Sequence, residues 1–324
     1  MAKGLDFGLP FFYRVVLPGA VVGAVLLPLL HLFTPALPPD VQLIEDIGLA
    51  AIVGIALSAL SAALYEFYEG RRLWPSRLYL NRIAASDARM RRIHKEAVEA
   101  YERRADPAEQ RRYDDRTSLL RREFMINTDG APIVVAPTRL GNILAAYRHY
   151  PMDRYGMSAP FYWERLWLAI DKDTREEIDK GWAPADCFVH MAGGLVIAGM
   201  LYGLVTLVIV LFGIWWHLDA LPVALPLGLA AATLLIASYI SYGLSLPMHV
   251  ATGESFKAVF DLHRPKLADM NVGSDADRQR WYALWNTLQH RVTASASTPA
   301  AQRQAAAPQP QAAVPPETDD SGEL

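Results

Sequence analysis

The sequence predicts an all-α membrane protein with four transmembrane helices and a helical cytoplasmic domain. Three observations lead to this fold class. The chain of 324 residues is 52% hydrophobic, and its charged residues, 20% of the total, are segregated into a few blocks. Four apolar runs are long enough to cross a hydrocarbon layer about 30 Å thick, which needs about 20 helical residues. Lysine and arginine gather at particular ends of these runs, as they do on the cytoplasmic side of a membrane.

The four expected spans are 15–33, 47–64, 195–216 and 223–246. Pro18 and Pro28 interrupt the first run, but membrane helices tolerate proline, usually with a kink. A cleaved signal peptide is the rival interpretation, because Lys3 precedes the apolar run. That run is long and lacks a small-x-small cleavage site, so we favour an uncleaved span.

Basic residues near the span ends predict the orientation. They precede spans one and three and follow spans two and four, whereas the connections 34–40 and 217–222 contain neither lysine nor arginine. Both termini and the loop 65–190 are therefore expected in the cytoplasm of a bacterium, with the spans in its inner membrane. The expected organisation is a cytoplasmic N-terminus (1–14), two spans (15–64), a cytoplasmic helical domain (65–190), two spans (191–246), cytoplasmic helices (247–291) and a disordered tail (292–324).

Small residues recur at helical spacing on the spans, where they let helix backbones approach closely. The candidate packing positions are Gly54, Ser58, Ala62, Gly199, Gly203, Ala237 and Ser241. They fit packing within one four-helix bundle, and they also fit contacts between subunits of a homo-oligomer. No acidic or basic residue lies at mid-depth, which disfavours ion-coupled transport. A channel stays open as an alternative, because small polar groups and backbone can line a pore.

The loop between spans two and three is expected to form several helices. Two are highly charged, about 86–105 and 107–125, and Asp106 is the expected cap of the second. A short extended run at 132–137 precedes a helix over 139–149, which Thr138 caps. A turn at 150–156 follows, then a helix from Ala159 and a short one from Thr174.

After the last span, 253–264 is expected to continue it as an amphipathic helix. A further helix near 274–288 carries Trp281 and Trp285. Its apolar face is expected to pack on the helix over 159–170, so that both chain segments build the cytoplasmic domain.

Three sequence segments resemble a family of uncharacterised bacterial four-span membrane proteins. They read T-R-L-G-N at 138–142, D-R-Y-G at 153–156 and W-x-R-L-W at 163–167, and a fourth, F-D-L-x-R, follows the last span at 260–264. Glu164 stands where that pattern has proline. The resemblance implies the membrane architecture, and it implies no activity and no site residues.

The Arg- and Tyr-rich part of the loop supplies the candidate site. Guanidinium groups match phosphate and carboxylate bidentately, and near the inner leaflet the natural anion is a lipid head group. The candidate contacts are Arg139, Asn142, Asp153, Arg154, Tyr155 and Arg165. The same residues could instead hold the domain together through buried hydrogen bonds, which is the interpretation we favour over catalysis.

No catalytic residue, metal or cofactor is expected. The sequence lacks nucleophile-elbow, phosphate-loop and dinucleotide-binding motifs, and Cys187 is the single cysteine. The net charge of −3 gives no reason to expect nucleic acid. The favoured function is a non-catalytic scaffold or signalling component that binds another protein or a lipid head group through its cytoplasmic face. The alternatives are an oligomeric ion channel, with an architecture like that of bestrophins, and a membrane-surface enzyme acting on a lipid or anionic metabolite.

Overall fold

The described part of the chain is helical apart from one pair of short strands. The computed structural model describes residues 8–33, 38–126, 132–217 and 219–269, all of which belong to the unit Met1–Asp269. Four of its helical stretches are long and apolar enough to cross a membrane, which confirms the prediction of an all-α chain with four candidate spans. The expected helix with Trp281 and the tail 292–324 lie outside the described residues.

The first candidate span is assembled from α1 (Leu9–Phe11), a π-helical turn η1 (Phe12–Val16) and α2 (Leu17–Phe33). Helical structure begins at Leu9, before the apolar run 15–33 that predicted the span, and it includes the aromatic residues ahead of Arg14. Pro18 has no N–H to offer the carbonyl of Arg14. The Nδ1 atom of His190 lies 3.0 Å from that oxygen instead, so a side chain of the third span satisfies the group that proline leaves free.

The second candidate span, α3 (Pro39–Ala59), packs against the first through glycines. A Cβ atom on Gly19 or Gly23 would fall within 3 Å of the α3 backbone, and one on Gly54 would lie 2.3 Å from the carbonyl oxygen of Val15. This close approach is the arrangement that small residues permit in membranes. Helix α3 ends at Ala59, and after Leu60 the chain enters the next helix, α4 (Ser61–Glu69).

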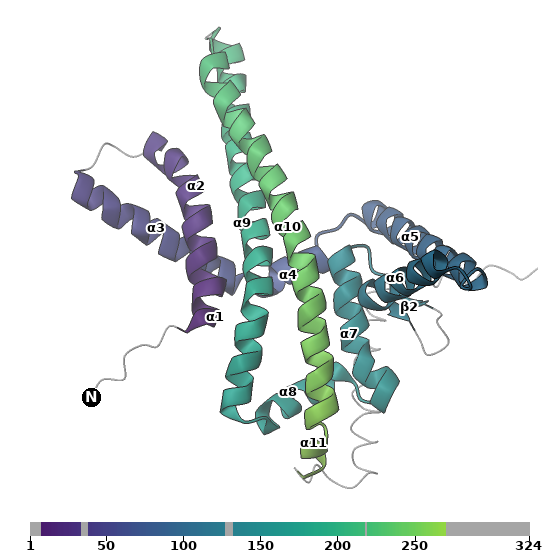
Figure 1. Ribbon diagram of the computed structural model, residues 1–324. Coiled ribbons are helices and arrows are strands. Elements are labelled where there is room, and N and C mark those ends of the chain that lie inside the picture. Colours follow the sequence, from purple (N-terminus) through teal and green to yellow (C-terminus); the bar gives the residue numbers. More distant parts are fainter. Residues whose placement is uncertain (1–7, 34–37, 127–131, 218, 270–324) are drawn as a thin grey trace, which may run out of the picture. The chain divides into compact units, whose positions relative to one another are not determined.

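The third and fourth candidate spans lie within two long helices, α9 (Lys172–Trp216) and α10 (Leu221–His263), which run side by side (Figure 1). With 45 residues, α9 is about 67 Å long, roughly twice the thickness of a hydrocarbon layer. The expected short helix from Thr174 is therefore wrong. Asp171 is the actual cap, and the helix runs without a break into the apolar segment.

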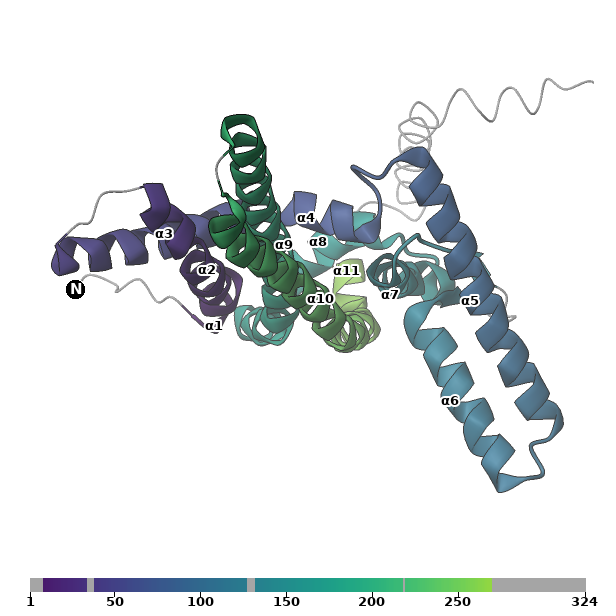
Figure 2. The same cartoon turned by 90° about the horizontal axis from the view of Figure 1, so that it is seen from above.

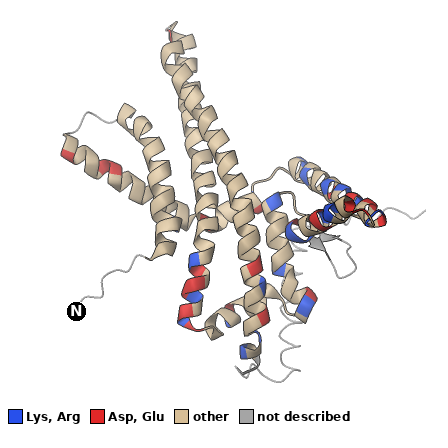
Figure 3. Cartoon of the chain, viewed as in Figure 1, with Lys and Arg blue, Asp and Glu red and all other residues tan. Residues whose placement is uncertain are grey.

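Charge is distributed unevenly along these helices (Figure 3). The apolar parts of α9 and α10 carry almost no lysine, arginine, aspartate or glutamate, whereas the opposite ends and the helices around them carry many. Because a helix surrounded by lipid is apolar on all sides, this division marks which part of each long helix suits the hydrocarbon layer.

The two charged helices form an antiparallel pair, which we call the charged hairpin: α5 (Ser76–Glu102) and α6 (Pro107–Glu123) (Figure 2). The first starts ten residues earlier than expected. The Asp106 side chain caps the second by accepting a hydrogen bond from the amide of Ala108, 2.9 Å away, as predicted. A small apolar core that includes Met90, Ile93 and Phe124 holds the pair together.

The chain then pairs β1 (Met125–Ile126) with β2 (Pro132–Val134) and enters α7 (Arg139–Tyr155), which Thr138 caps as predicted. The expected turn at 150–156 is wrong, because α7 continues through Pro151. It ends at Gly156, whose φ of 63° closes the helix in the left-handed conformation. The C-cap residue Gly156 ends this helix, and Pro151 inside the helix does not.

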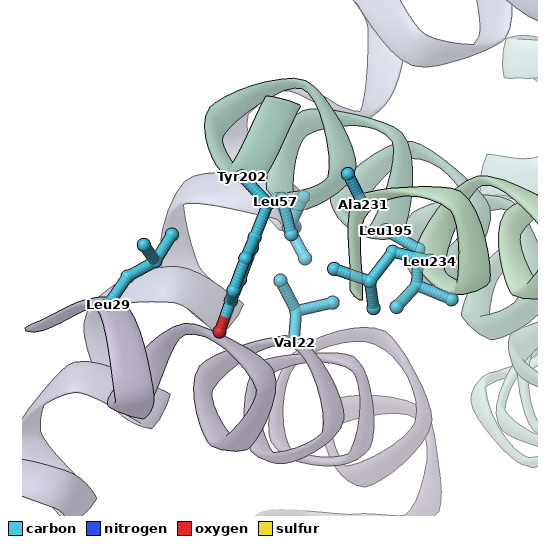
Figure 4. Close-up of a cluster of buried hydrophobic side chains, with 8 residues drawn as sticks. Val22, Leu29, Leu57, Leu195, Tyr202, Ala231 and Leu234 are labelled. Carbon is cyan, nitrogen blue, oxygen red and sulfur yellow. The ribbon is translucent and has the colours of Figure 1, made fainter. Parts of the chain in front are cut away.

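Two apolar cores each join helices from distant parts of the chain. In the first, side chains of α2, α3, α9 and α10 meet around Val22, Leu195 and Tyr202, and the Tyr202 hydroxyl donates to the carbonyl of Val25, 2.8 Å away (Figure 4). In the second, α8 (Ala159–Ala169) packs on the end of α10 and on α11 (Pro265–Asp269). The continuation of span four as an amphipathic helix is thus confirmed, and Phe260 is fully buried there.

Candidate functional site

A polar network joins four segments that are far apart in the sequence. The two carboxylate oxygens of Asp186 accept from the Tyr65 hydroxyl at 2.5 Å and from Nε of Arg14 at 2.6 Å. The Tyr65 oxygen lies 2.9 Å from Nε2 of His249, and Arg14 also pairs with Asp179 at 2.7 Å. Residues of η1, α4, α9 and α10 therefore meet at one point. The start of the first and third candidate spans and the end of the second and fourth lie together there.

The phenol of Tyr65 acts as a donor in this network. Burial raises its pKa well above the ordinary value for tyrosine, and the negative charge of Asp186 raises it further. The phenol therefore keeps its proton at physiological pH and binds the carboxylate.

A buried carboxylate, Glu69, anchors α7 to the end of α4. Nη1 of Arg148 lies 3.1 Å and 3.2 Å from its two oxygens, and Nη2 of Arg71 lies 2.6 Å from one of them. The Glu69 side chain is only 6% exposed, so these two guanidinium groups provide the compensation that a buried charge needs.

A cavity of about 500 Å³ opens between these two polar groups. One wall is aromatic: the Trp163 ring stacks on Trp182 at 5.3 Å between centroids and lies 4.6 Å from Phe256, whose ring is 5.1 Å from that of Tyr147. Thr252 belongs to the lining as well. The volume and the mixture of aromatic walls with a few polar groups are typical of small-molecule sites.

Tyr147 belongs to the aromatic wall of the cavity. Burial raises its pKa to about 12, although the neighbouring Arg148 offsets part of that effect. A neutral, buried phenol next to Phe256 provides a shaped wall that does not titrate near neutral pH.

A further buried carboxylate, Glu123, fastens the charged hairpin to α7. It pairs with Arg89 of α5 and with Arg139 of α7. Burial alone would raise its pKa, but the hydrogen bonds and charges of the two arginines outweigh burial and lower the pKa below the usual range. Glu123 is therefore charged at neutral pH and joins the two arginines.

The structure distributes the six predicted contact residues over several places. Arg139 pairs with Glu123, and Asn142 is buried, with its amide bonded to Ser86 and to both backbone groups of Ala136. Asp153 and Arg154 are exposed near the other end of α7, about 20 Å along the helix from Arg139 at 1.5 Å per residue.

Tyr155 and Arg165 have structural neighbours of their own. The Tyr155 hydroxyl donates to Asp261 at 2.5 Å, and Arg165 lies over the Phe161 ring at 3.8 Å. None of the six lines the aromatic cavity, and their role as anion contacts remains a prediction.

The predicted packing positions differ in their surroundings. Gly54 is buried against Val15, whereas Ser58 is half-buried and Ala62 is exposed. A Cβ on Gly199 would approach Leu235 within 3.1 Å, and one on Gly203 would meet nothing within 4 Å. Ala237 is half-buried. The Ser241 hydroxyl donates to the carbonyl of Phe188, 2.9 Å away, which joins α10 to α9.

Sequence reasoning missed the residues that build the cavity. Trp182 and Asp186 follow the start of the short helix expected at Thr174, and Tyr65 and His249 lie just beyond the expected spans 47–64 and 223–246. The available signal was the position of Tyr65 and His249 within one helical turn of an apolar run, and of Asp186 within three turns of one. Polar residues near span ends are common, so their convergence could not be inferred without the fold.

In comparisons with known proteins, no family model, no curated protein and no solved structure matches the chain. Within residues 8–269, apart from the short gaps already given, no three His, Cys, Asp or Glu side chains come together as metal ligands would.

Proposed function

We propose that this chain is a bacterial inner-membrane scaffold or signalling component whose charged hairpin binds a protein partner in the cytoplasm. The observation that carries the proposal is the way the hairpin is held. Its base is fixed to α7 through the buried Glu123, while much of its long surface is exposed. A rigidly mounted, exposed surface of this kind suits recognition of another protein, because little ordering entropy is lost on binding.

The surface of the charged hairpin contains apolar side chains among its charges. Val98 is 44% exposed and Tyr101 is 46% exposed, and the guanidinium of Arg104 lies 4.0 Å from the Tyr101 ring centroid. Aromatic and arginine side chains are enriched at protein interfaces, where they supply much of the binding energy. The expected partner presents a complementary surface of mixed charge around an apolar centre.

A second cavity, of about 570 Å³, gives a partner access to both the hairpin and the fourth span. It lies between α6 and α10 and is lined mainly by polar and charged residues, among them Asp114, Arg121, Glu254 and Lys257. A segment bound there would contact α6 and the extension of α10 at once. Binding at the hairpin would in this way be coupled to the position of a membrane helix.

The partner is expected to co-purify with the native protein and to be lost when the hairpin surface changes. The variant combines Val98→Lys with Arg92→Glu, two exposed positions of α5. We expect retention of the partner to fall at least about tenfold, as for interface residues worth about 1.4 kcal/mol or more. The readout is quantitative mass spectrometry of complexes purified from native membranes.

Leu168→Lys is the matched control, since Leu168 is 70% exposed and lies on α8, outside the hairpin. It should retain the partner. The proposal is wrong if the wild-type complex contains no stoichiometric partner, or if the hairpin variant and the control retain it equally.

The proposed orientation places both termini and residues 65–190 in the cytoplasm. It is supported by the basic residues near the span ends, and the network around Asp186 is consistent with it because those four ends lie together. Cysteine labelling measures it directly. With Cys187 replaced by alanine, Gln110→Cys should react with a membrane-impermeant maleimide only in inverted vesicles.

Asp219→Cys, on the connection between α9 and α10, should react only in intact spheroplasts. Reversed labelling of the two positions would overturn the orientation, and labelling of both from the same side would contradict the pairing of span ends.

A further inference from the structure

We propose that the aromatic cavity binds an amphiphile, a molecule with an apolar body and one carboxylate or phosphate head group. This inference concerns a different surface from the charged hairpin and does not depend on a protein partner. It follows from three properties of the cavity: its apolar wall, the state of its acceptors, and its unused donors.

The apolar wall matches the body of the ligand. The rings of Trp163, Trp182, Phe256 and Tyr147 form a continuous surface, and Ala159 with Pro160 adds small apolar groups from the start of α8. Removing apolar ligand surface from water against such a wall is favourable by about 25 cal/mol per Å² before the costs of association. A fully polar ligand would leave this wall unused.

The acidic and imidazole groups at the cavity are already engaged. The two oxygens of Asp186 accept from Tyr65 and Arg14. The two nitrogens of His249 lie 2.8 Å from the carbonyl oxygen of Ser245 and 2.9 Å from the hydroxyl oxygen of Tyr65. Among the lining residues, the two guanidinium groups of Arg71 and Arg148 outnumber the single carboxylate, Asp186, and would repel an ammonium group. An amine is therefore a poor match for the site.

The unused polar groups of the lining are donors. Thr252 is only 8% exposed, and its hydroxyl has no hydrogen-bond partner among the described residues; the indole Nε1–H of Trp182 is buried and likewise unpartnered there. Buried donors normally find a partner, so these two can bind an acceptor that the described residues do not supply. Arg71 and Arg148 also line the cavity, and each carries five N–H donors, more than Glu69 occupies.

These donors and guanidinium groups favour an anionic acceptor over a neutral one, because charge-assisted hydrogen bonds are roughly twice as strong as neutral ones. A carboxylate or a phosphate satisfies the same donors, so a free fatty acid and an anionic phospholipid share the required chemistry. The position of the cavity next to the ends of the spans makes both accessible.

The test uses the full-length protein in phosphatidylcholine nanodiscs. The probes are palmitate and phosphatidylglycerol that carry a photoreactive diazirine in the acyl chain, and cross-linked peptides are mapped by mass spectrometry. We expect cross-linking of α8 and of the Trp182–Asp186 segment that unlabelled palmitate or phosphatidylglycerol competes away. Competable labelling by the free acid alone identifies a soluble amphiphile, and labelling by the phospholipid identifies a membrane lipid.

Two conservative variants remove the unused donors. Thr252→Val and Trp182→Phe should each raise the half-saturating probe concentration about tenfold, the usual effect of losing one hydrogen bond to a charged group. The matched controls are Thr206→Val, whose hydroxyl bonds the carbonyl of Tyr202 within α9, and Trp167→Phe, which belongs to the same ring stack but does not line the cavity. The controls should bind as the wild type does.

The proposal is overturned if neither probe gives competable labelling in the cavity, or if both donor variants bind with unchanged affinity. Equal labelling by the corresponding diazirine-bearing fatty alcohol would also overturn it, because the head group would then need no charge. If one donor variant fails to fold, which size-exclusion chromatography would show, the other still decides the outcome.

Discussion

Replacing Gly54 with alanine is expected to destabilise the protein by about 1–3 kcal/mol, the usual cost of forcing an extra methyl group into a packed interior. The new Cβ would lie 2.3 Å from the carbonyl oxygen of Val15 and 3.1 Å from its carbonyl carbon. Those atoms belong to a helix backbone, so no side chain can rotate away. The first candidate span would have to move off α3 to make room.

Gly48 provides the matched control on the same helix, because a Cβ at that position would meet nothing within 4 Å. Gly48→Ala should leave stability unchanged or raise it slightly, since alanine favours the helix. The measurement is unfolding by SDS in bicelles, followed by tryptophan fluorescence. Equal midpoints for the two variants would show that the first two spans do not pack through Gly54.

Local rules predicted the four long apolar helices and several caps correctly, because each depends on residues that are close in sequence. The four apolar runs are long enough for spans whatever the rest of the chain does. Asp106 and Thr138 cap their helices because a short polar side chain precedes a helical pattern, and the amide that it binds lies two or three residues away. These inferences need no knowledge of tertiary structure.

Helix ends inside the loop were harder to predict, because competing signals had to be ranked. The sequence predicts a turn at 150–156, yet the helix continues through Pro151 to its C-cap at Gly156. Asp171 and Thr174 both resemble caps, and the structure uses Asp171, whose carboxylate accepts from the amide of Thr174 at 2.9 Å. Proline inside a helix costs stability that packing can repay, and only the packed structure shows that it does.

The cavity could not be predicted, because its parts come from distant segments. Tyr65 and Asp186 are separated by 121 positions in the sequence, and Arg14 and Asp186 by 172. By contrast, the Arg- and Tyr-rich segment attracted attention because its unusual residues are close in sequence. There, Arg139, Asn142 and Tyr155 each bind other parts of the protein.

Asp186→Ala is expected to lower the free energy of unfolding by about 2–3 kcal/mol. The carboxylate joins η1, α4 and α9, and its removal takes one partner from Arg14 and one from Tyr65. Breaking a fully buried charge pair costs about 3–5 kcal/mol. The effect here is smaller, since the side chains of Arg14 and Asp186 are 28% and 22% exposed and Arg14 keeps Asp179.

The same helix provides a control in Asp173, which is exposed in the first turn of α9. Asp173→Ala should cost no more than a few tenths of a kcal/mol, from the lost interaction with the helix dipole. SDS unfolding in bicelles compares the two variants under one condition. Equal effects of Asp186→Ala and Asp173→Ala would show that the polar network does not hold the four candidate span ends together. They would also show that the network does not fix the wall of the cavity beside it.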